Sequence, residues 1–155
     1  MSCGIAIAAA LLLSDPNVAL AAAQPMAVAG APVSVAAEPL FIDIVARSSA
    51  LKAVVDAWTG APSDFDGFKV QAAELAAMDM QAHLILKERG TDGDLKCILR
   101  GISEDIPRKI EAVETATTPQ ARATAIGELS YLLNDNVEVI TSPPQPEAQS
   151  GVATN

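Results

Sequence analysis

The sequence predicts an all-α fold, an up-down four-helix bundle that follows an export signal and a flexible spacer. Hydrophobic residues make up 50% of the chain but aromatic residues only 3%, because alanine supplies the excess, and alanine is the best helix former. Runs of strand-forming residues are nearly absent. After residue 37 the apolar residues recur at spacings of three and four, and the short connections between these segments favour antiparallel neighbours.

The first 37 residues are built differently from the rest, since Asp15 is their one charged side chain. An apolar run over 3–13 has the length of a signal-peptide core and is too short to span a bilayer as a helix. Two A-x-A cleavage sites follow it, which predicts a signal peptide over 1–23 and an Ala/Pro/Val-rich spacer over 24–37. No Lys or Arg precedes the apolar run, so an upstream start or an uncleaved leader remains the alternative.

The first helix is expected from about residue 40 to 58, where Ser48 is the polar member of an apolar stripe. The other members of the stripe are Phe41, Ile44, Leu51, Val55 and Trp58. The second helix is expected over 63–89, with Ser63 as its N-cap and Gly90 as the glycine that ends it.

The third helix starts near 91–94 and carries its apolar face through Pro107, which predicts a kink there or a split with a restart at Ser103. That face consists of Leu95, Ile98, Leu99, Ile102, Ile106, Ile110 and Val113. The fourth helix begins at Thr118, a cap that is followed by proline, and runs to about Ile140. These segments define a bundle domain over 38–141, and the proline-containing polar tail over 142–155 is expected to be disordered.

The net charge of −9 comes from 10 basic and 19 acidic residues, so no nucleic-acid partner is expected. No membrane span is expected after signal cleavage. Cleavage would remove Cys3 and leave Cys97 as a lone thiol in an oxidising compartment. A helical projection places Cys97 on the polar side of the third helix, which makes it a candidate for an intermolecular disulfide and a homodimer. The alternative is a buried cysteine that packs as a small hydrophobic residue.

Asp79 and His83 are the first candidate pair for chemistry, because they lie four residues apart on the apolar side of the second helix. Such a pair could orient a general base or help hold a metal. A self-satisfied structural pair is favoured, since neither a nucleophile nor further ligands are evident. Met80 and Met78 add thioethers that suit copper, but residues two apart on a helix point to different sides, which favours core filling.

The chain carries no glycine-rich phosphate loop, C-x-x-C pair or G-x-S-x-G elbow, so no catalytic residue, metal or cofactor is predicted. The preferred hypothesis is a non-enzymatic, periplasmic or secreted helical protein that acts as an interaction, accessory or scaffold module with a protein partner. One alternative is a metal or small-ligand binder that uses Asp79 and His83 inside the bundle. A cytosolic regulator is the second alternative, if the leader is not cleaved.

Overall fold

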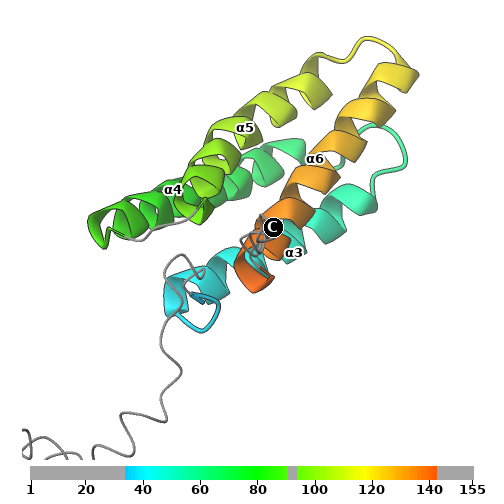
Figure 1. The fold of residues 1–155 in the computed structure, drawn as a ribbon. Helices are drawn as coiled ribbons and strands as arrows, with labels where there is room; N and C mark the ends of the chain where they lie inside the picture. Colours follow the sequence, from blue (N-terminus) through cyan, green and yellow to red (C-terminus); the bar gives the residue numbers. More distant parts are fainter. Residues whose placement is uncertain (1–33, 91–93, 143–155) are drawn as a thin grey trace, which may run out of the picture.

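The computed structural model describes residues 34–90 and 94–142, and this part of the chain holds four helices and no strand (Figure 1). They are α3 (Pro39–Asp56), α4 (Phe65–Glu88), α5 (Leu95–Thr115) and α6 (Pro119–Thr141). The prediction of an all-helical domain with four helices is therefore confirmed. The predicted signal peptide, most of the spacer and all but the first residue of the tail lie outside the described residues.

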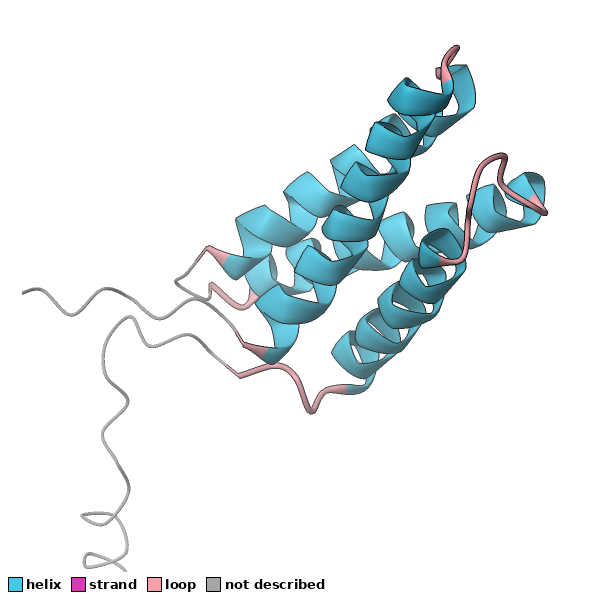
Figure 2. Ribbon diagram, turned by 90° about the vertical axis from the view of Figure 1, so that its right-hand side faces the viewer, coloured by secondary structure: helices cyan, strands magenta, loops and turns pink. Residues whose placement is uncertain are grey.

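The four helices pack around one shared core. α3 packs against α4 and α6, and α5 packs against the same two helices (Figures 1 and 2). The largest fully buried side chains come from all four helices and include Phe41, Leu75, Leu99 and Leu129. Burying one such side chain stabilises a fold by about 1.5–3 kcal/mol, so the core is the main source of stability.

The apolar stripe of α3 is buried as predicted, with Ser48 fully enclosed among its hydrophobic neighbours. Trp58, just after the helix, is partly buried and meets two rings of α4 edge-on. Its ring centroid lies 4.8 Å from that of Phe68 and 5.9 Å from that of Phe65. Val35, which the sequence assigns to the spacer, is 1% exposed, so core packing begins before the predicted start of the domain.

The start of α4 differs from the prediction, because Asp64 and not Ser63 is the N-cap. Asp64 has a φ of 48°, in the left-handed region that aspartate tolerates better than most residues. A Cβ on Gly67 would collide with the Asp64 carboxylate, so the missing side chain there makes room for this turn. The end of α4 is as predicted: Gly90 has a φ of 64°, and its N–H donates to the carbonyl of Lys87.

α5 is one continuous helix through Pro107, so the predicted split with a restart at Ser103 is wrong. Pro107 is exposed, while Ile106 and Ile110 on either side of it are buried in the core. Packing on the inner face therefore keeps the helix in one piece although proline removes one backbone hydrogen bond. α6 begins as predicted, because the hydroxyl of Thr118 accepts the N–H of Ala121 at 3.1 Å.

Candidate functional site

Asp79 lies on α4 with none of its surface exposed, and its hydrogen-bond partner is on another helix. Its Oδ2 accepts a hydrogen bond from the side-chain amide of Asn136 on α6 at 2.9 Å. Its Oδ1 has no hydrogen-bond partner. The hypothesis of a self-satisfied pair of Asp79 and His83 is therefore wrong, because the carboxylate bonds across the core to α6 and keeps one oxygen without a partner.

Asn136 is the buried residue that the sequence analysis missed. It is fully buried, and its Oδ1 also has no hydrogen-bond partner. A signal was present: Asn136 follows Leu133 by three residues and precedes Ile140 by four, which places it on the apolar stripe of α6. A polar residue at such a position indicates a buried polar contact, although the sequence does not say with which helix.

His83 is partly buried and contacts α5. Its Nδ1 lies 2.6 Å from the carbonyl oxygen of Lys96 in the first turn of that helix. A carbonyl only accepts hydrogen bonds, so Nδ1 carries the proton and donates it to this contact. The imidazole thus fastens the end of α4 to the start of α5.

The candidate metal ligands make contacts with different helices. Asp79 is bonded to α6 and His83 to α5, while Met80 is partly buried on α4. Within residues 34–90 and 94–142 no group of three or more His, Cys, Asp and Glu side chains could hold an ion. Met78 packs against the hydrophobic core, as the core-filling hypothesis predicts.

The surroundings of Asp79 change its acidity. Burial raises the pKa of its carboxyl group from 3.8 to about 8, and the N–H from Asn136 opposes this shift. A carboxyl group with such a pKa is protonated at neutral pH. It is enclosed by the core and so cannot meet a substrate in this structure.

Cys97 is exposed on α5, as the helical projection predicted, and its thiol is free in the part of the chain that the structure describes. The alternative of a buried cysteine is wrong. The intermolecular disulfide and the homodimer through Cys97 remain predictions, because exposure makes the thiol accessible but does not identify its partner.

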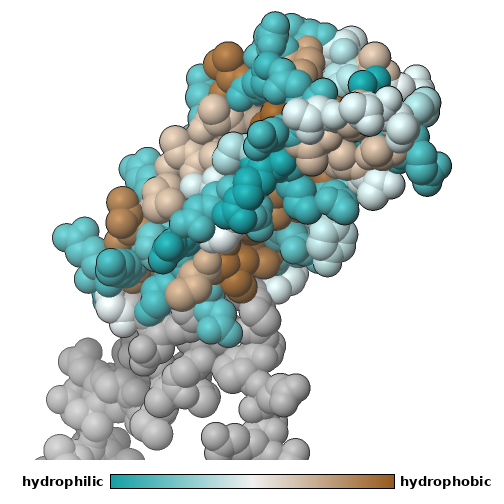
Figure 3. Space-filling view, turned by 90° about the horizontal axis from the view of Figure 1, so that it is seen from above, coloured by the Kyte–Doolittle hydropathy of each residue, from teal (hydrophilic) through white to brown (hydrophobic). Residues whose placement is uncertain are grey.

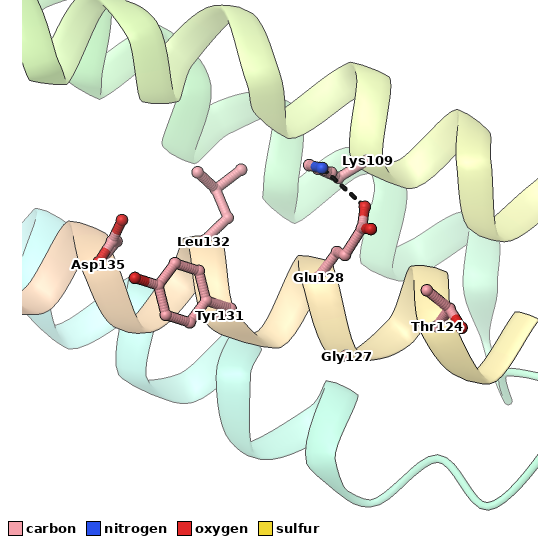
Figure 4. A pocket seen from close by; sticks show the side chains of 7 residues that line it. All are labelled: Lys109, Thr124, Gly127, Glu128, Tyr131, Leu132 and Asp135. Carbon is pink, nitrogen blue, oxygen red and sulfur yellow. Dashed lines mark hydrogen bonds and ion pairs between the residues drawn. The ribbon is translucent and has the colours of Figure 1, made fainter.

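An open groove of about 470 Å³ lies between α5 and α6, and no candidate residue from the sequence analysis falls in it. Its walls are formed by Lys109, Thr124, Gly127, Glu128, Tyr131, Leu132 and Asp135 (Figure 4). Lys109 and Glu128 form an ion pair of 2.7 Å across the groove. Tyr131 is 68% exposed and lies one turn from Gly127, whose missing side chain leaves the helix surface open. The spacing of three and four along α6 is the signal that could have located this face.

The remaining exposed large apolar residues are dispersed. They are Ile42 and Val54 on α3 and Val70 and Leu84 on α4. The face of the molecule in Figure 3 likewise shows small apolar patches separated by hydrophilic side chains. Single apolar residues of this kind are common on soluble surfaces and do not define a site.

No protein-family model, curated protein or solved structure matches this chain. None of the helices in the described residues is long and apolar enough to cross a membrane. The candidate sites therefore rest on the residues and their geometry alone.

Proposed function

We propose that the protein is a non-enzymatic, exported helical module that binds a partner protein through the groove between α5 and α6. The observation that carries the proposal is Tyr131, an aromatic side chain that is 68% exposed beside the open helix surface at Gly127. Tyrosine is enriched at protein interfaces because it brings a large apolar ring and a hydrogen-bonding hydroxyl together. Export to the periplasm or the exterior is part of the proposal and is supported by the leader sequence alone.

We also infer that the four helices run up-down-up-down. Two ion pairs between α3 and α4 support this order: Glu38 pairs with Arg89, and Arg47 pairs with Glu74. A step forward along α3 thus corresponds to a step back along α4. Between α4 and α5, the contacts Lys69–Glu114 and His83–Lys96 follow the same reversed order. Between α5 and α6, the contacts Lys109–Glu128 and Ala116–Arg122 do so as well.

The charge of the groove indicates which partner fits. Glu128 is already paired with Lys109, whereas Asp135 adds a further carboxylate beside Tyr131 (Figure 4). The whole chain has a net charge of −9. Charge complementarity therefore favours a protein segment that places a basic side chain next to an apolar one.

The binding proposal is tested with a photo-crosslinking amino acid at position 131 in the full chain, expressed in its native host. Val70 on α4 is the matched control, because it is 62% exposed and lies outside the groove. A partner that crosslinks from 131 and not from 70 is then purified, and its affinity is measured by titration calorimetry. Tyr131→Ser should weaken binding at least about tenfold, while Val70→Ser should not change it. Equal crosslinking from both positions would count against the groove.

The export proposal has its own test, the intact mass of the protein from its native host. A mature chain that starts near Ala22 or Gln24 is expected, because cleavage follows small residues at A-x-A sites. A mass that retains residues 1–23 would replace export by the cytosolic alternative. That result would leave the groove proposal standing.

A further inference from the structure

If the carboxyl group of Asp79 is ionised, its buried contact with Asn136 has too few hydrogen-bond donors for its acceptors. Asn136 donates one hydrogen bond to Oδ2 of Asp79. The two remaining side-chain oxygens, Oδ1 of Asp79 and Oδ1 of Asn136, are both buried and both lack a donor. Buried acceptors without donors are rare in native proteins, so each requires an explanation.

One added proton would satisfy both atoms together. A protonated carboxyl group and a primary amide each offer one donor and one acceptor on the same edge, so they can form two parallel hydrogen bonds. The bond from Asn136 to Asp79 is the first of these. A proton on Oδ1 of Asp79, donated to Oδ1 of Asn136, supplies the second and leaves neither oxygen without a partner.

We propose that Asp79 is held as a neutral carboxylic acid, doubly hydrogen-bonded to Asn136, and that this pair makes the fold sensitive to pH. Loss of the proton would place a negative charge in an apolar core and break the second hydrogen bond between α4 and α6. The folded bundle is therefore most stable in acid, and its free energy of unfolding falls as the pH rises.

The other helices offer Asp79 no counter-charge. Burial is the larger cause of its raised pKa, and the hydrogen bond from Asn136 is the opposing cause. Every other charged or titratable side chain on the described helices is at least partly exposed, including Asp43 and Arg47 on α3, His83 on α4, Lys96, Arg100 and Glu104 on α5, and Asp135 and Glu138 on α6. His83 follows Asp79 by four residues on α4, and its Nδ1 contacts the carbonyl of Lys96.

The direction of the effect follows from linkage. The pKa of Asp79 is about 8 in the folded protein against an ordinary value of 3.8, so between these values the folded state holds a proton that the unfolded chain has released. Unfolding then releases one proton, and the unfolding constant from this group rises about tenfold for each unit of pH. Below the lower value and above the upper value the contribution of Asp79 no longer changes with pH.

Urea unfolding of the full chain, followed by far-UV circular dichroism between pH 5 and 7, tests the proposal. The wild-type unfolding constant should rise about tenfold per pH unit relative to that of Asp79→Asn. Asparagine at this position can form both hydrogen bonds without a titrating proton, so its slope should vanish apart from the background of other groups. Asp43→Asn is the matched control, since it makes the same substitution at an exposed position of α3. The control should keep the wild-type slope.

A second measurement needs no variant. The ¹³C resonance of the Asp79 carboxyl group in the wild-type protein should have the position of a neutral acid at pH 6. A resonance that titrates near pH 4, or an Asp79→Asn variant that keeps the full slope, would overturn the proposal.

Discussion

Replacing Ser48 with alanine should make the protein more stable, although the change removes a polar group from the centre of α3. Ser48 is completely buried, and its hydroxyl has no hydrogen-bond partner. A buried hydroxyl without a partner costs about 1.5 kcal/mol, because it loses its bonds to water and gains none in return. Alanine also has the higher helix propensity, by about 0.5 kcal/mol. The expected gain in the free energy of unfolding is therefore about 2 kcal/mol.

Ser49 provides the control for this prediction, because it is the next residue of the same helix but is exposed. Its hydroxyl donates to the carbonyl of Val45 at 2.8 Å, a contact that water can replace at the surface. Ser49→Ala should therefore raise the free energy of unfolding only through the higher helix propensity of alanine, by about 0.5 kcal/mol. Both variants are compared with the wild type by urea unfolding at one pH. The slope of the free energy of unfolding against urea concentration is taken as the same for all three proteins. If Ser48→Ala proved less stable than Ser49→Ala, the hydroxyl of Ser48 would have a partner in solution and the reasoning would fail.

Three further predictions concern the ends of two helices and the exposed thiol. Thr118→Ala should lower the free energy of unfolding by about 1 kcal/mol through loss of the N-cap of α6, and Thr117→Ala, next to it and exposed, should have little effect. Gly90→Ala should cost about 1 kcal/mol because its φ is 64°, whereas Gly60→Ala, with open space and no positive φ, should be nearly neutral. Urea unfolding checks all four, and equal effects within either pair would contradict the assignment. Cys97 should react with maleimide in the folded protein, as judged by mass; labelling only after denaturation would contradict its exposure.

The sequence predicted the helices well where the signal is local. Apolar spacing located all four, and Thr118 and Gly90 marked two of their ends through hydrogen bonding and backbone conformation that depend on a few neighbouring residues. The predicted N-cap of α4 was wrong by one residue, because the fit of the Asp64 carboxylate over Gly67 is a steric detail that cap preferences do not contain.

The candidate site was harder to predict because its contacts cross the bundle. Asp79 and Asn136 are 57 residues apart, and their contact depends on how α4 and α6 are rotated about their own axes. Periodicity identifies the inward face of each helix but not which residues of two inward faces meet. Spacing within one helix therefore suggested His83 as the partner of Asp79, although packing directs the imidazole to α5 instead.

The aromatic contact between α3 and α4 gives the protein a built-in optical probe. Trp58 is the only tryptophan in the chain, and its indole Nε1 is buried without a hydrogen-bond partner while its ring lies against Phe65 and Phe68. Its fluorescence therefore comes from one place, the connection between two helices, and should shift to longer wavelength when water enters there. Because Tyr131, the only tyrosine, is exposed on α6, emission excited selectively from tryptophan separates opening of this connection from events at the groove.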